Sequence, residues 1–234
     1  MATAALALGL AAAPGAGAQE SPLGLLAADS VRPAARVQLF SSPDGQVRFI
    51  LDRTPRSYAL MQVLGDDEVY VMRPLPAASG DEVYATDDRG LVIRVRPNGA
   101  VTVYTRVHRD GTPVSRDGAA APIAPEPMAQ VALQQRLAQL QITVRRSVGR
   151  PIAIEAPPSQ GPDAFLVLDA ATRAAQALSQ TPQVPVQRIV ILLGPAPMAQ
   201  VQGQTLIITV APGMGFAGRP STAAVRTVVA PAPR

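Results

Sequence analysis

Residues 87 to 105 read "DDRGLVIRVRPNGAVTVYT" and contain two runs in which apolar and mostly polar side chains alternate. Positions 91, 93 and 95 of the first run and 101 and 103 of the second are Leu, Ile or Val. Such alternation predicts two strands, each with one buried and one solvated face. Arg96-Pro97-Asn98-Gly99 lies between them and predicts a type I turn with the glycine in a left-handed conformation. The stretch therefore indicates an antiparallel hairpin.

The same pattern extends in both directions, from Arg36 to Arg106. Short strand-forming segments follow one another at a spacing of roughly ten residues, which is typical of an antiparallel meander. These seven segments are RVQLFS, QVRFILD, SYALMQV, EVYVMR, DEVYAT, LVIRVR and AVTVYT. Because a meander this long would otherwise expose its edges, we expect residues 36–107 to form a strongly curved sheet or a small barrel.

Residues 108–127 interrupt this alternation with four prolines and two Asp-Gly pairs. A stretch of this length is long for a connection within one compact unit, so we expect a linker between two lobes. Met128 to Val148 then carries leucines and valines at spacings of three or four. This spacing predicts an amphipathic helix, which Gly149 and Pro151 would end.

The rest of the chain predicts a second, smaller lobe at residues 128–229. Asp163 is expected to cap a helix that ends at about Ser179. Four strands are expected at PIAIEA, QRIVILLG, AQVQG and QTLIITV, the last two joined at Gly203. Helices would cover one face of this small sheet, and the fold class expected for the whole chain is α+β with the β-meander first.

Gly213, Gly215 and Gly218 follow the last expected strand at the G-x-G-x-x-G spacing of dinucleotide-binding proteins. That fingerprint needs a helix and a second parallel strand after the glycines, with an acidic residue about 20 residues further on. Only 16 residues follow Gly218, and none is acidic. We therefore expect an irregular loop that buries Phe216 while the glycines supply positive φ angles, followed by a short helix-like segment capped by Ser221.

Composition excludes several chemistries. The chain has no cysteine, and its single histidine, His108, is unable to form a multi-histidine metal site. All 21 basic residues are arginines scattered along a chain with 3% aromatic residues, which argues against nucleic-acid binding. Asp66–Glu68 and Asp87–Asp88 are interpreted as solvated turn acids and not as calcium ligands. We expect no cofactor and no metal site.

The N-terminal segment "ALALGLAAAPGAGAQE" combines an apolar run, a Pro-Gly break and a small-x-small triplet that ends at Ala18. This pattern predicts a secretory signal peptide, residues 1–18, cleaved before Gln19. The alternatives are a short membrane anchor or an Ala-rich leader that stays attached. The apolar run is shorter than the roughly 20 residues that a membrane span needs. We expect a periplasmic or secreted mature chain without a transmembrane segment.

Three segments resemble the landmarks of an uncharacterised family of exported alphaproteobacterial proteins, known as a domain of unknown function. They are FILDR (49–53), VYVMRPLPAASGDEVY (69–84) and VAPGMGFAGRPST (210–222). The chain departs from that pattern at residues 97–102, where the family has a GGLT-like run, and at Thr54 and Thr222, where serine is commoner. The resemblance covers about residues 37–225 and implies a secreted, cysteine-poor protein, without implying a particular activity, substrate or cofactor.

Charged residues expected to be buried are Asp52-Arg53, Arg73, Asp81 and Arg219. A structural ion pair or a turn hydrogen bond is the first expectation for each. Arg73, Asp81 and Arg219 are the candidate binding residues. No serine stands in a G-x-S-x-G motif, and no catalytic residue is predicted.

These observations favour an exported, non-enzymatic protein that binds an envelope partner or acts as a structural module. Two alternatives stay open. One is a periplasmic hydrolase that uses a pair of carboxylates, whose separation is a three-dimensional property. The other is a small-anion-binding protein that uses Arg73 or Arg219.

Overall fold

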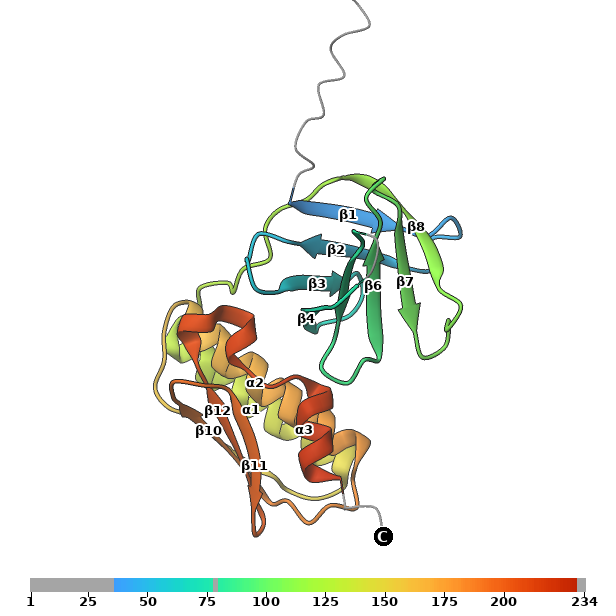
Figure 1. The fold of residues 1–234 in the computed structure, drawn as a ribbon. Helices are drawn as coiled ribbons and strands as arrows, with labels where there is room; N and C mark the ends of the chain where they lie inside the picture. The colour runs from blue at the N-terminus through green and yellow to red at the C-terminus, as the bar shows by residue number, and fades with distance from the viewer. Residues whose placement is uncertain (1–35, 78–79, 231–234) are drawn as a thin grey trace, which may run out of the picture. The chain divides into compact units, whose positions relative to one another are not determined.

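The computed structural model describes residues 36–77 and 80–230 (Figure 1). The predicted signal peptide, residues 1–18, lies outside these ranges. Within them, no helix has both the length and the apolar character that a membrane crossing requires.

The N-terminal part is a closed antiparallel barrel of eight strands, each paired with its neighbours in sequence order. Six of the seven predicted segments each contain one of these strands and the seventh, EVYVMR, overlaps β4, which confirms the meander, and closure makes it a barrel. The strands are β1 (Val37–Ser41), β2 (Arg48–Asp52), β3 (Ala59–Val63), β4 (Val69–Leu75), β5 (Glu82–Ala85), β6 (Leu91–Val95), β7 (Val101–Thr105) and β8 (Thr112–Ala119).

The eighth strand, β8, lies inside the stretch 108–127 that was expected to be a linker. Residues 112–114 pair with β7 and residues 115–119 pair with β1, so β8 closes the barrel by bridging its two ends. Pro113 stands where β8 pairs on one side only, a position at which a strand tolerates proline. The local sequence does not predict this strand, because the prolines and Asp-Gly pairs of the stretch are typical of turns. Pairing with β1 and β7 nevertheless makes residues 112–119 a strand.

The barrel interior is filled by the apolar positions of the alternating strands. Phe40 and Phe49 stack with ring centroids 5.3 Å apart, and Ile93 and Val103 are buried as their alternation predicts. This core is separate from the larger apolar core of the C-terminal part. Alternation within single strands is therefore enough to identify the inward face of the barrel.

Three turns of the barrel, at residues 42–45, 87–90 and 96–99, have glycine in the fourth position, and in two of them, including the predicted turn Arg96–Gly99, that glycine is left-handed. Gly45 and Gly99 have φ angles of 69° and 83°, in the left-handed region. In Asp87–Gly90, by contrast, the left-handed residue is Arg89, with a φ angle of 53°. The amide of Gly90 instead donates a 2.9 Å hydrogen bond to the Asp88 carboxylate, so a side chain and not a glycine closes this turn.

The C-terminal part contains a four-stranded sheet in the order β11-β12-β10-β9, with its helices on one side (Figure 1). β10 runs parallel to both β9 and β12, and β11 forms an antiparallel hairpin with β12. The whole chain is therefore α+β. The elements are α1 (Gln130–Val148), β9 (Ala153–Glu155), α2 (Pro162–Gln180), β10 (Arg188–Leu193), β11 (Met198–Gln202), β12 (Thr205–Val210), the 3-10 segment η2 (Pro212–Gly218) and α3 (Thr222–Val229).

Helices α1 and α2 were both predicted from the sequence, but the residue that caps α2 was not. Gly149 ends α1 in the left-handed conformation, and its amide donates to Arg145. The prediction that Asp163 caps α2 is wrong, because Gly161 is the N-cap residue and Pro162 takes the first helical position. Proline suits that position, since its missing N–H would have no partner there and its φ angle is already helical.

The glycine-rich segment after β12 is a compact turn that buries Phe216, as predicted. Of its three glycines only Gly215 has a positive φ, of 56°, so the expectation is wrong for Gly213 and Gly218. Gly218 is needed for space, because a Cβ there would lie 1.9 Å from the carbonyl oxygen of Ala211. Ser221 caps α3 as predicted: its hydroxyl accepts from the amide of Ala224 at 3.0 Å.

Gly218→Ala should destabilise the protein, because the added methyl group overlaps the Ala211 carbonyl oxygen and disrupts the 2.7 Å hydrogen bond from the Ala211 amide to the carbonyl of residue 218. Overpacking of this kind costs about 1–3 kcal/mol, and the backbone contact places this case at the upper end. Gly213→Ala is the matched control, since a Cβ there meets no atom within 4 Å. Urea denaturation of both variants measures the difference, and equal stabilities would contradict the steric explanation.

Candidate functional site

The acidic turn between β3 and β4 is anchored by its own side chains. Asp66 accepts from the amide of Glu68 at 3.0 Å and from the hydroxyl of Tyr70 at 2.6 Å. These two bonds hold the turn so that Glu68 points inward and is buried. The interpretation of residues 66–68 as solvated acids is therefore wrong for Glu68.

Helix α2 contributes Asp169 and Arg173, which stand four residues apart on one face. Their Oδ1 and Nε atoms are 3.2 Å apart. The neighbouring positions on this face are mostly alanines, including Ala170 and Ala174, which are fully buried. Small side chains let the helix pack closely, and Asp169 and Arg173 are thereby withdrawn from water.

Arg219 enters the same place from the end of η2, with only 1% of its side chain exposed. Its Nε pairs with Asp169 Oδ2, and its Nη2 donates to the carbonyl of Val69 at 2.8 Å. Its Nη1 lies 3.7 Å from Glu68 Oε1, and the guanidinium carbon is 5.9 Å from the centre of the Phe216 ring. One arginine thus contacts β4, α2 and the glycine-rich segment.

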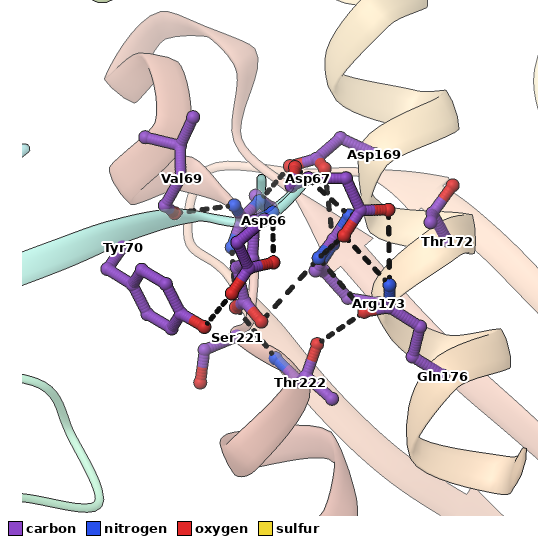
Figure 2. A network of polar contacts seen from close by, with 12 residues as sticks. Asp66, Asp67, Val69, Tyr70, Asp169, Thr172, Arg173, Gln176, Ser221 and Thr222 are labelled. Carbon is purple, nitrogen blue, oxygen red and sulfur yellow. Dashed lines mark hydrogen bonds and ion pairs between the residues drawn. The ribbon is translucent and has the colours of Figure 1, made fainter. Parts of the chain in front are cut away.

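Arg173 on α2 completes the network, close to Asp67, Asp169 and Gln176 (Figure 2). Its guanidinium lies 3.5 Å from Glu68 and 3.3 Å from Asp67, and it donates to Gln176 at 2.9 Å. Gln176 in turn donates to Asp67 at 3.0 Å and accepts from the hydroxyl of Thr222 at 3.1 Å. Although Arg173 Nε is within ion-pair distance of Asp169, its N–H is not aligned for a hydrogen bond.

We call Glu68, Asp169, Arg173 and Arg219, which are buried, the buried ion network; its two acids and two arginines balance, and the exposed Asp67 pairs with Arg173 at its edge. Burial by itself would lower the pKa of Arg173, but Asp169, Glu68 and Asp67 outweigh it and the pKa is raised. Burial would raise the pKa of Asp67, and bonds from Gln176 and Arg173 instead lower it. Each buried charge therefore faces an opposite one, which is the condition under which burial is tolerated.

Two hollows adjoin the network at the surface and share Tyr70, Thr86, Asp87 and Ser221. One has a volume of about 230 Å³ and lies between β4, the start of β11 and α3. The other has a volume of about 390 Å³ and lies beside the β5–β6 turn. Ser221 donates its hydroxyl to Asp87 across the boundary between them. Both hollows are shallow and have mixed apolar and charged walls.

The three predicted binding residues do not form one site. The expectation that Arg73 is buried is wrong, because it is exposed on β4, where it lines the smaller hollow together with Arg219. Asp81 lies elsewhere, immediately before β5, where it accepts a 2.6 Å hydrogen bond from Nε of Arg94. The donors of Arg219 are engaged by protein oxygens, which makes it a structural residue.

Sequence reasoning identified Arg219 but missed Glu68, Asp169 and Arg173. The one local signal was the i, i+4 pair Asp169 and Arg173 on a helix whose surrounding residues are alanines. Nothing local distinguishes Glu68 from Asp66 and Asp67, because its burial depends on elements far away in sequence. The described residues contain no group of three or more His, Cys, Asp or Glu side chains arranged to hold a metal ion.

A closed eight-stranded barrel, followed by a mixed sheet with helices on one side and joined to it by buried ion pairs, defines an α+β protein. The chain belongs to the family described as "Domain of unknown function (DUF4908)", whose pattern matches residues 23–229. This match confirms the resemblance to an uncharacterised family. No curated protein and no solved structure shows significant similarity to the chain.

Arg219→Met should lower the free energy of unfolding by about 3–5 kcal/mol, because it leaves Asp169 buried without its closest cation. Arg73→Met removes the same charge from an exposed position and should change stability by less than about 0.5 kcal/mol. Urea denaturation at neutral pH measures both. A small effect for both variants would show that the buried ion network is dispensable.

The stability of the protein should fall in acid partly through Asp67. Its pKa is lowered below the usual 3.8 in the folded state, so its contribution is complete above that value and is lost as the pH falls through the lowered pKa. Melting temperatures measured from neutral pH to below 3.8 should therefore decline less steeply for Asp67→Asn than for the wild type. Asp110→Asn changes an exposed acid that forms no ion pair within residues 36–77 and 80–230, and this variant should decline as the wild type does.

Proposed function

We propose that this protein is an exported, non-enzymatic component of the cell envelope that binds another protein through the uncovered face of its mixed sheet. The export part rests on the apolar run and the small-x-small triplet before Gln19. The binding part rests on one structural observation, which is the apolar and uncovered sheet face described next.

All three helices pack on the same side of the sheet. α1 and α3 both contact α2, and α2 contacts β10 and β12. Along β12, Leu206, Ile208 and Val210 are buried against the helices, while the alternate residues are only partly buried. The opposite face carries those alternate residues and their neighbours on β10. We call it the open face; it comprises Val190, Leu192, Thr205, Ile207 and Thr209.

An uncovered face is unusual for a sheet with parallel strands, because parallel sheets normally have both faces covered. Ile207 pairs with Val190, and Leu192, the next residue on the same side of β10, is 46% exposed. None of the three belongs to either apolar core. Completing the burial of such side chains contributes up to about 1.5–3 kcal/mol each, which supports a protein–protein contact.

The edge of the open face is polar, as expected of a protein interface. Arg188 stands opposite Thr205 on β12, and its guanidinium lies 3.3 Å from the carboxylate of Glu155 on β9. An apolar centre with a charged rim is the arrangement that protein partners recognise. We therefore expect a partner with an apolar surface of its own.

The carboxylates that line the surface hollows are Glu68, Asp87 and Asp88, and each is engaged by another side chain, which supports a non-enzymatic function. Asp87 accepts from the hydroxyl of Ser221, and Asp88 accepts from the guanidinium of Arg106. Glu68 and Asp169 approach the same two arginines, and their side chains are 8% and 9% exposed. Both act as acceptors of ion pairs that hold the fold together. A carboxylate engaged in this way is not free to serve as a nucleophile or as a general acid.

The binding proposal is tested by recovering partners from an envelope extract with the tagged mature protein. Leu192→Gln should abolish recovery of the partner that the wild type retains. Ile142→Gln is the matched control, because Ile142 on α1 is also 46% exposed. Equal loss with both variants, or recovery of a second copy of this chain alone, would overturn the proposal of a distinct partner.

The export proposal has a separate test. The N-terminus of the protein recovered from its native envelope should lie near Gln19. A protein that retains residues 1–18, or one found only in the cytoplasmic fraction, would contradict export without affecting the binding experiment.

A further inference from the structure

A cluster of arginines lies at one end of the barrel, beside the first two strands. Arg36 immediately precedes β1 and Arg53 immediately follows β2. The amide of Arg53 donates to the carbonyl of Arg36 at 2.8 Å, which continues the β1–β2 ladder by one pair beyond Val37 and Asp52. The two arginines therefore stand directly opposite each other, where like charges repel unless an anion lies between them.

A third arginine, Arg56, comes from the turn after β2 and lines the same hollow, which has a volume of about 400 Å³. The remaining lining residues are Pro55, Glu82 and Tyr84. This volume falls within the range of small-molecule sites. Unlike the two hollows near the buried ion network, this one is walled mainly by cations.

Glu82 is the single carboxylate in the wall, and it is already engaged. Its Oε2 lies 3.2 Å from Nη1 of Arg53 and accepts from the hydroxyl of Tyr84 at 3.0 Å. Among the described residues, neither Arg36 nor Arg56 has a carboxylate within ion-pair distance. Three guanidinium groups thus face one carboxylate, which leaves an excess of two positive charges.

The turn that carries Arg53 and Arg56 is anchored by the buried side chain of Asp52. Asp52 is buried and accepts from the amide of Thr54 at 2.8 Å and from the amide of Ile123 at 3.0 Å. A carboxylate with two backbone donors fixes the start of the turn. The backbone positions of the two arginines are therefore set before any ligand arrives.

The hydroxyl of Tyr84 donates its one proton to Glu82 and so fixes the position of that carboxylate. Burial and the bond to Glu82 raise the pKa of Tyr84, and Arg53 offsets this only in part. The phenol therefore keeps its proton at neutral pH. It holds Glu82 on the side of Arg53 and away from the unpaired arginines.

We propose that Arg36, Arg53 and Arg56 form a binding site for a dianionic phosphate group, either free inorganic phosphate or a phosphomonoester headgroup. Guanidinium groups match phosphate oxygens in pairs of parallel hydrogen bonds, and an excess of two charges suits a dianion. This site is separate from the open face and does not depend on the proposed partner. It assigns anion binding to arginines other than Arg73 and Arg219.

Calorimetric titration of the mature protein with inorganic phosphate, at constant ionic strength, tests the site. The expected result is saturable binding with one phosphate per chain. Arg56→Gln should weaken it on the order of tenfold, because one charge-assisted contact is lost. Arg109→Gln removes the same charge from an exposed residue of the β7–β8 turn and should leave the affinity unchanged.

A variant that binds phosphate more tightly distinguishes a specific site from general attraction of phosphate to the positively charged protein. Glu82→Gln removes the competing carboxylate and should tighten phosphate binding severalfold. Glu155→Gln is matched to it, because Glu82 and Glu155 are 54% and 55% exposed and each pairs with one arginine. If both glutamine variants raise the affinity equally, or if Arg56→Gln and Arg109→Gln weaken it equally, the proposal is overturned.

Vesicles of phosphatidylcholine with and without phosphatidic acid identify the source of the phosphate. Binding to inorganic phosphate and not to vesicles supports a soluble ligand. Retention on vesicles that contain phosphatidic acid, lost in Arg56→Gln and kept in Arg109→Gln, supports a headgroup. Absence of saturable binding in both arms overturns the proposal.

Discussion

The contact between Arg219 and its partners holds the described structure together. Its guanidinium touches the start of β4, the middle of α2 and the ring of Phe216, so one side chain fixes three elements that are distant in sequence. Because it is buried, its contribution depends on every donor having an acceptor. Arg173 and Glu68 complete that set, and Gln176 and Thr222 extend it to α3. Loss of the Arg219 side chain would leave buried charges of this network without their partner.

Two features of the chain make this network possible. The alanine-rich face of α2 allows close packing, which excludes water from Asp169 and Arg173. The contact between Gly218 and Ala211 turns the chain sharply after β12, so that the next residue, Arg219, enters the interior. Within the spacing that resembles a dinucleotide fingerprint, Gly218 is therefore required sterically, and its close contact with Ala211 brings Arg219 to two buried carboxylates.

The same construction leaves two surfaces that the core does not use. The described helices are all on one side of the mixed sheet, so the open face has apolar residues that no other described element covers. At the barrel, the β1–β2 ladder brings two arginines opposite each other with one carboxylate nearby. The first surface suits an apolar partner and the second suits an anion, and the two differ in the force that would drive binding. Burial of apolar area would dominate at the open face, and Coulomb attraction would dominate at the barrel end.

The sequence by itself determined the features that depend on near neighbours. Alternation at residues 91–105 identified two strands and their inward side, Ser221 was recognisable as a helix cap, and Gly149 as a helix end. The spacing of apolar residues, the residue preferences of turns and helix capping all act over a few residues. They can therefore be recognised in the sequence before the fold is known. Asp163 was misassigned because proline at the first helical position moved the cap by two residues.

Only the tertiary structure decided the closing strand β8, the burial of Glu68 and the role of Arg219. Arg219 and the Val69 carbonyl it binds are 150 residues apart, and Arg173 is 106 residues from Asp67. Which acid of residues 66–68 turns inward depends on where α2 and η2 come to lie. Likewise, Arg36 and Arg53 become a pair only when β1 and β2 align in register. Ion pairs between residues so far apart in sequence form only when the whole chain folds, so no local sequence pattern predicts them.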